Sequence, residues 1–147
     1  MRVTILRGIS GAGKTTWVKD HVADAVVVSA DHHFTIDGEY KFDRSKLQEN
    51  HNKCFKKFLE AILKSELWII VDNTNIETWE YAPYVLAARA YDYEVELITF
   101  ICSVELSQSR KDLVPTEQLQ NMQKRLDEET EYMPQRFRSI HRVINIC

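Results

Sequence analysis

Short apolar runs alternate along this chain with longer segments that mix apolar and polar residues. The runs are nearly continuous in Val, Ile and Leu, which is typical of strands covered on both faces of a parallel sheet. Strands are therefore predicted at residues 2–7, 25–29, 67–71, 95–100 and 142–146. Their alternation with helical segments predicts an α/β fold, a five-stranded and mostly parallel sheet flanked by helices.

The longest helix is predicted over residues 45–65, where apolar residues recur at spacings of three and four. Ser45 and Gln48 fit a capping box at its start. Further helices are expected directly after residue 13 and over residues 77–90, 103–109 and 116–129. Residues 31–43, which include an Asp37-Gly38 turn signal, are interpreted as a loop beyond the second strand.

The composition indicates a single globular domain over residues 1–147, because no repeat or linker divides the chain. Hydrophobic residues make up 44% and charged residues 28%, which excludes disordered and fibrous classes. The net charge of −3 gives no overall attraction to nucleic acid, so a polynucleotide would need a local patch. No apolar run approaches the roughly 18 residues of a membrane span, and no membrane partner is expected.

The three cysteines, Cys54, Cys102 and Cys147, lack the spacing of metal ligands. Cys54 lies in a helical pattern and Cys102 follows a strand, so both are interpreted as small core residues in a reducing compartment. A glycine-rich motif begins within eight residues of Met1 and leaves no room for a signal peptide. These features lead us to expect a cytoplasmic protein.

The first strand runs directly into Gly8-Ile-Ser-Gly-Ala-Gly-Lys14-Thr15, the spacing and the context of a P-loop. Its glycines let backbone N–H groups turn toward phosphates, and the following helix N-terminus favours negative charge. Lys14 is expected to reach the β- and γ-phosphates of ATP, and the Thr15 hydroxyl to ligate Mg²⁺. The predicted ATP-binding residues are Gly8, Ser10, Gly11, Ala12, Gly13, Lys14, Thr15 and Thr16.

Acidic and amide side chains follow the second and third strands, where ligands of parallel sheets bind. Asp31 is a candidate base that takes the proton of an acceptor hydroxyl, although an aspartate there can also simply cap a loop. Asp72, at the tip of the third strand, is placed where an acid that holds Mg²⁺ or its water is expected. Asn73 and Asn75 add uncharged contacts for a substrate. Alternatively, this segment forms an Asx turn that caps the next helix.

Two further groups of polar residues are ambiguous. His32 and His33 are adjacent and therefore point in different directions, and no third ligand is evident, so substrate contact or exposure is favoured over a metal site. Arg110 and Lys111 follow a short helical segment and are interpreted as a lid that supplies a catalytic, ATP-contacting arginine. A solvated basic pair is the alternative.

The segment from residue 132 to residue 147 holds Arg136, Arg138, His141 and Arg142 and no acid. Phe137 between them could stack on a base while the arginines meet phosphates. An ordinary basic turn leading into an edge strand is equally compatible with this pattern. Trp79, which starts a helix, is explained at least as well by core packing as by base stacking.

From Arg7 to about Arg125 the chain resembles the kinase domain of the polynucleotide 5′-hydroxyl kinase family. The matching blocks are, in order, Arg7-Gly-Ile-Ser-Gly-Ala-Gly-Lys-Thr15, Ser29-Ala-Asp31-His-His-Phe34, Gly38-Glu-Tyr40, His51, Ile70-Val-Asp72-Asn-Thr-Asn75, Trp79-Glu-x-x-Pro83-Tyr84 and Arg110…Val114-Pro115…Met122. The resemblance implies a P-loop kinase fold with an α-helical lid. It also implies ATP-dependent phosphorylation of a 5′-hydroxyl of DNA or RNA, with Asp31 as base, Arg110 as lid arginine and Asp72 with Asn73 in the acceptor pocket.

The chain departs from the family pattern at His32, where a second acid is common, and at Phe34, where some members carry an arginine. Lys111 stands where an asparagine commonly follows the lid arginine. These differences keep phosphoryl transfer but leave the acceptor open, and a small metabolite or a hydroxymethylated base is the alternative. A nucleotide-dependent switch without an acceptor is a third possibility, against which Asp31 and Arg110 argue.

Overall fold

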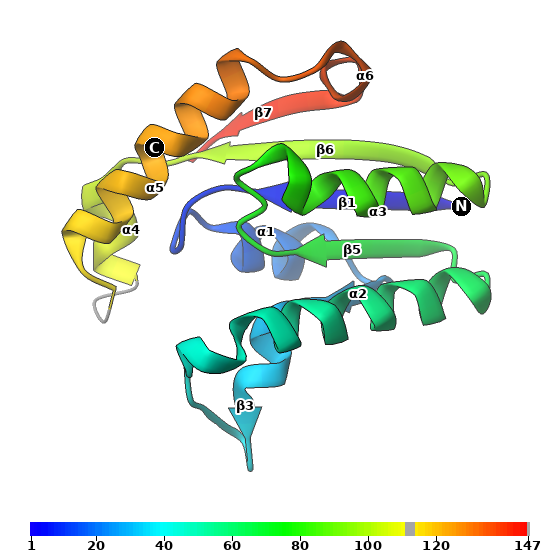
Figure 1. The fold of residues 1–147 in the computed structure, drawn as a ribbon, viewed down its shortest axis with the longest axis horizontal. Coiled ribbons are helices and arrows are strands. Elements are labelled where there is room, and N and C mark those ends of the chain that lie inside the picture. Colours follow the sequence, from blue (N-terminus) through cyan, green and yellow to red (C-terminus); the bar gives the residue numbers. More distant parts are fainter. Residues whose placement is uncertain (111–113, 147) are drawn as a thin grey trace.

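The computed structural model describes residues 1–110 and 114–146, and a five-stranded parallel sheet forms the centre of this part of the chain (Figure 1). The sheet contains β1 (Arg2–Arg7), β2 (Val26–Val28), β5 (Trp68–Asp72), β6 (Glu94–Ile101) and β7 (His141–Asn145). Its strand order is β2-β5-β1-β6-β7, and each pair of neighbours is parallel. The predicted α/β fold class is thereby confirmed.

Helices cover both faces of this sheet (Figure 1). They are α1 (Lys14–His21), α2 (Leu47–Leu63), α3 (Thr78–Ala90), α4 (Val104–Arg110), α5 (Thr116–Glu131) and α6 (Gln135–Arg138). Side chains alternate along β1, so that Val3 and Ile5 pack in the core under α2 and α3, whereas Leu6 packs in the core under α1 and α5. This double coverage explains why the strands are nearly continuous in apolar residues.

The segment predicted as a loop contains regular structure. A 3₁₀-helix spans Ala30–Phe34, and a two-stranded hairpin follows, formed by β3 (Thr35–Ile36) and β4 (Glu39–Tyr40). Asp37 and Gly38 both have positive φ angles, 53° and 78°, as a two-residue hairpin turn requires. The Asp-Gly signal was therefore a hairpin signal, but strands of two residues are too short to show an alternating pattern.

The predicted capping box of the long helix is wrong. Helix α2 begins at Leu47, and the preceding 3₁₀-turn, Arg44–Lys46, is capped by Asp43. One carboxylate oxygen of Asp43 accepts hydrogen bonds from the backbone N–H of Ser45 at 3.0 Å and from its hydroxyl at 2.7 Å. Ser45 is thus a donor to a cap rather than the cap itself.

Cys54 and Cys102 are buried free thiols, as expected, and Cys147 lies outside the described residues. Among residues 1–110 and 114–146, no helix has both the length and the apolar character needed to cross a bilayer.

The guanidinium of Arg7, at the end of β1, is fully buried. It donates hydrogen bonds to the carbonyl oxygens of Asn75 at 3.0 Å and Ile76 at 2.8 Å. It also donates to the hydroxyls of Thr99 on β6 at 3.0 Å and Thr130 on α5 at 2.7 Å. Burial lowers the pKa of this guanidinium, but an arginine keeps its charge in proteins. One side chain therefore joins four segments at the carboxyl edge of the sheet.

Replacing Arg7 by Met is expected to lower the free energy of unfolding by about 3 kcal/mol or more, because each buried acceptor left without a donor costs roughly 1–3 kcal/mol. Urea unfolding of the two proteins measures this change. The control is Arg44→Met at an exposed position, for which a change below about 0.5 kcal/mol is expected. Equal stability of Arg7→Met and the parent protein would contradict the role given to Arg7.

Candidate active site

The P-loop connects β1 to α1 at the carboxyl edge of the sheet. The ammonium of Lys14 donates to the carbonyl oxygens of Gly8 and Ile9, each at 2.9 Å, and the side chain is almost completely buried. Gly13 has a φ of 97°, and a Cβ at this position would lie 3.1 Å from Nη1 of Arg110. The loop therefore needs glycine at residue 13 for its backbone conformation, and the absence of a side chain there leaves room for Arg110 to approach.

The end of β5 lies beside the start of α1 because β5 pairs with β1 and places Asp72 opposite Leu6. The Thr15 hydroxyl donates to Oδ2 of Asp72 at 2.8 Å. Hydroxyl and carboxylate oxygens are hard ligands of the kind that Mg²⁺ takes, and Mg²⁺ commonly uses one or two protein ligands together with nucleotide phosphates. This pair fits the metal predicted from the sequence.

A cavity of about 600 Å³ opens at this edge of the sheet. The P-loop lines part of it, and the other lining residues include Asp31, Tyr40, Asp72, Asn73 and Arg110. The parallel sheet thus brings the segments after β1, β2 and β5 to one cavity. Most residues predicted to form the catalytic site lie together in it.

Asn73 holds the segment that carries Asp31. Its side-chain oxygen accepts from the backbone N–H of Ala30 at 2.8 Å, and its side-chain nitrogen donates to the Cys54 sulfur at 3.5 Å. The Tyr84 hydroxyl donates to the same sulfur at 3.3 Å. Burial raises the pKa of the Cys54 thiol and of Tyr84, which favours the neutral forms of both groups. A neutral buried network therefore fixes the distance between the ends of β2 and β5.

Arg110 lies at the end of α4 and is exposed to solvent. Its Nη1 donates to the carbonyl oxygen of Gly11 at 3.2 Å, which places the guanidinium against the P-loop. Helices α4 and α5 contact each other and form the helical lid of the fold. Lys111, the second basic residue of the predicted pair, lies outside the described residues.

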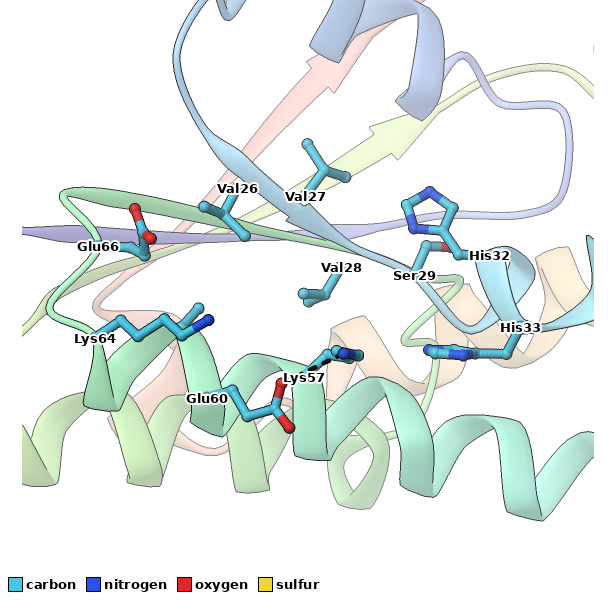
Figure 2. A pocket seen from close by; sticks show the side chains of 11 residues that line it. Val26, Val27, Val28, Ser29, His32, His33, Lys57, Glu60, Lys64 and Glu66 are labelled. Carbon is cyan, nitrogen blue, oxygen red and sulfur yellow. Dashed lines mark ion pairs between the residues drawn. The ribbon is translucent and has the colours of Figure 1, made fainter.

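His32 is exposed, which is one of the two alternatives predicted for it, and it is not among the residues that line the P-loop cavity. His32 and His33 face a separate cavity of about 330 Å³ between β2 and α2, with Val28 and Lys57 among its other lining residues (Figure 2). The pKa of His33 is lowered, first by burial and then by the charges of Lys53, His32 and Lys57. The 3₁₀-turn after β2 directs Asp31 and His32 to different sides, and that turn was not predicted.

The prediction that Asn75 belongs to the acceptor site is wrong. Its side chain is 2% exposed and donates to the carbonyl oxygen of Leu6 at 2.8 Å. The backbone of Asn75 has a φ of 46°, a conformation that asparagine tolerates better than most residues. Asn75 therefore shapes the turn after β5 and offers no contact to a substrate.

For two aromatic residues outside the cavity, the structure excludes one of the alternatives that the sequence left open. Trp79 is 67% exposed, and its indole N–H donates to Glu77 at 2.6 Å, so it is not a core residue. Phe137, in contrast, is buried and packs edge-on against Tyr81 with ring centroids 5.3 Å apart. It cannot stack on a base without leaving the core.

The basic C-terminal segment has structural partners. Arg138 donates to the carbonyl oxygens of Glu131 at 2.9 Å and Met133 at 3.2 Å, at the end of α5. Arg142 lies 3.4 Å from a carboxylate oxygen of Glu96. Figure 1 shows α6 toward the amino ends of the strands, away from the P-loop edge. The segment is an ordinary basic turn before an edge strand, and we do not retain it as an acceptor surface.

Tyr40 is a cavity residue that sequence reasoning did not assign. Burial raises the pKa of Tyr40, and the charge of Asp31 and a hydrogen bond to Asp31 raise it further. The signal was present in the sequence, because Tyr40 follows the Asp37-Gly38 turn within a matching block of the resemblance. Without the hairpin, however, nothing indicated that the residue returns toward Asp31.

A family model described as AAA domain matches residues 3–129. The chain belongs to the AAA domain family. NEDD4-binding protein 2 from Homo sapiens is a relative of this AAA domain, 36% identical over an alignment of 96 residues that covers 63% of this chain. The chain spans only 5% of the length of that relative.

Solved structures share the fold of this AAA domain. A chain of the Pnkp1/Rnl/Hen1 RNA repair complex superimposes with a TM-score of 0.73 at 20% identity and covers 90% of this chain, which in turn covers 46% of it. The gluconokinase from Sinorhizobium meliloti 1021 has a TM-score of 0.62 at 11% identity, with 99% and 83% covered. The fold is that of a P-loop kinase, and its likeness to the RNA repair complex agrees with the resemblance found in the sequence.

Replacing Lys14 by Ala is expected to weaken binding of a non-hydrolysable ATP analogue by roughly 10- to 100-fold, because a charge-assisted hydrogen bond contributes about 1.5–3 kcal/mol. Binding of AMP should change little, because the lysine is expected to reach the β- and γ-phosphates. Calorimetric titration measures both affinities. The control is Lys19→Ala, an exposed lysine on the same helix. An unchanged ATP affinity would contradict the P-loop assignment.

Proposed function

We propose that this domain is an ATP-dependent phosphotransferase whose acceptor is the 5′-hydroxyl of DNA or RNA. The observation that carries the proposal is that one cavity combines Lys14, the Thr15–Asp72 pair and Asp31. A phosphate cradle and a metal-holding pair would serve any P-loop protein. A carboxylate beside them, on a segment held by Asn73, is what a hydroxyl acceptor requires.

In the proposed reaction the P-loop and Lys14 bind the triphosphate, and Thr15 and Asp72 would hold Mg²⁺. When bound at this pair, the ion would neutralise charge on the β- and γ-phosphates. The acceptor oxygen forms a bond to the γ-phosphorus while the bond from that phosphorus to the β–γ bridging oxygen breaks, so that ADP leaves. Asp31 takes the proton of the attacking hydroxyl.

Arg110 is proposed to stabilise charge on the transferred phosphoryl group. Its guanidinium lies against the P-loop but is exposed, so it can exchange its contact with the Gly11 carbonyl for one with a phosphate. A nucleotide-binding switch needs neither this arginine nor Asp31, and the proposal of an enzyme rests on both.

The choice of acceptor is supported by the likeness to the kinase-fold chain of an RNA repair complex and by the resemblance of the sequence motifs. A second candidate is a small metabolite. One support is the likeness to the gluconokinase. The other is the small number of cations in the cavity: among the described residues that line it, Lys14 and Arg110 are the cationic ones. A hydroxymethylated base is a further acceptor that we group with this second candidate.

One competition reaction separates these acceptors. The protein is incubated with γ-labelled ATP and equal concentrations of a 5′-hydroxyl oligonucleotide, a nucleoside and gluconate, and the labelled products are separated. The proposal expects the label on the oligonucleotide, from which a phosphatase removes it. Label on gluconate or the nucleoside would select the second candidate, and release of free phosphate alone would contradict a kinase.

Asp31→Asn keeps the shape of the side chain and removes the proton acceptor. We expect kcat to fall by ~10²–10⁴ while the affinity for ATP is kept, because general base catalysis contributes about this factor. Steady-state kinetics and an ATP titration measure the two effects. Asp37→Asn is the matched control, because Asp37 lies at the exposed hairpin turn and asparagine tolerates its positive φ.

Loss of ATP affinity in Asp31→Asn, with turnover of bound ATP retained, would show that Asp31 is structural or a metal ligand. A kcat within about twofold of the parent protein would likewise remove Asp31 from the role of base.

A further inference from the structure

Exposed aromatic side chains gather on the hairpin beside the proposed acceptor site. Tyr40 at the end of β4 is 54% exposed and Phe42 is 57% exposed. Ile36 on β3 is 47% exposed. Large apolar side chains grouped in this way on one short segment commonly mark a binding surface.

The rings of Tyr40 and Phe42 both pack against one buried aromatic residue. Phe34 is buried, at 2% exposed, and its ring centroid lies 5.1 Å from that of Phe42 and 6.2 Å from that of Tyr40. The backbone N–H of Lys41, between the two exposed rings, donates to the carbonyl oxygen of Phe34 at 2.8 Å. The hairpin therefore presents Tyr40 and Phe42 as a fixed pair of aromatic surfaces.

This aromatic pair is continuous with the P-loop cavity. Tyr40 lines that cavity together with Asp31 and Asn73, and burial and then the nearby charge of Asp31 raise the pKa of the Tyr40 hydroxyl. One side chain thus offers a ring to solvent and a hydroxyl to the proposed base.

Positive charge lies next to the rings. Arg44 and Lys46, which flank Ser45 in the 3₁₀-turn, are exposed, and no ion pair is found for either within the described part of the chain. Lys41, in contrast, pairs with Glu39 at 3.9 Å. Two exposed rings followed along the chain by two exposed cations suit a single strand, whose bases stack while its phosphates meet the cations.

We infer that Tyr40 is the residue that recognises the acceptor: its ring stacks on the 5′-terminal base of a single strand, and its hydroxyl positions Asp31. Phe42 continues the stack on the following base, and Arg44 and Lys46 lie along the path of the phosphates. The inference rests on the proposed function and adds a basis for preferring acceptors that carry a base over sugar acids, because an aromatic ring stacks on any base.

The test uses two 5′-hydroxyl oligonucleotides that differ only in whether the first nucleotide carries a base. The parent protein should show a KM about 5- to 150-fold lower for the complete oligonucleotide than for the abasic one, the range expected for stacking of one base. Tyr40→Leu should raise the KM for the complete oligonucleotide by this factor and leave the abasic KM unchanged. Tyr91→Leu, at an exposed tyrosine after α3, is the matched control and should behave like the parent.

Tyr40→Phe separates the ring from the hydroxyl. It should keep the KM and the preference for a terminal base, while kcat falls by roughly 3- to 10-fold because Asp31 loses the neighbouring hydroxyl that the inference assigns to position it. A purely structural role of Tyr40 would not split KM and kcat between the two variants. Thermal unfolding with and without ATP verifies that each variant folds and binds nucleotide.

Failure of the inference and failure of the proposed function give different results. If Tyr40→Leu phosphorylates oligonucleotides with the parent KM and the parent preference for a base, the inference is overturned and the kinase proposal stands. If the parent protein phosphorylates gluconate and no oligonucleotide, the proposed acceptor is wrong and the inference falls with it.

Discussion

The buried guanidinium of Arg7 is the contact on which the candidate site depends. It joins the last residue of β1 to the turn that follows β5, to β6 and to the end of the lid helix α5. The turn after β5 follows directly on Asp72 and contains Asn73, and β1 leads into the P-loop. An arginine is suited to this position because its five N–H donors spread in one plane and reach several acceptors at once. Shifting any one of the four segments would leave a buried donor or acceptor without its hydrogen-bond partner.

Asn73 extends this arrangement toward the acceptor side. Arg7 fixes the turn after β5 against the P-loop, and Asn73 fixes the segment after β2 against β5 through the N–H of Ala30. The proposed metal pair and the proposed base are therefore connected through two consecutive residues, Asp72 and Asn73. Because a general base must lie within hydrogen-bond reach of the hydroxyl that it activates, a rigid link of this kind matters for rate as well as for stability.

The parts predicted well from the sequence depend on patterns that are local or periodic. The five strands and the phosphate loop belong to this class, because buried parallel strands are continuous in apolar residues and the loop requires glycines at set positions. The hairpin was missed because strands of two residues carry no period. Asn75 was misassigned for a related reason: its side chain is buried in a turn with a positive φ, which spacing does not reveal. The turn of 3₁₀-helix after Ser29 is equally invisible in spacing, which is why substrate contact and exposure both stayed open for His32. Trp79 and Phe137 show that an aromatic residue does not reveal its own exposure, which tertiary packing decides.

The central claim is that the phosphate of bound ATP moves to a nucleic-acid 5′-hydroxyl and not to water. A single turnover with protein in excess over ATP, in the presence of a 5′-hydroxyl oligonucleotide, measures this directly when the products are analysed by mass spectrometry. The account predicts that the oligonucleotide gains one phosphate at its 5′ end for each ADP formed. An unchanged oligonucleotide beside equal amounts of ADP and free phosphate would contradict it.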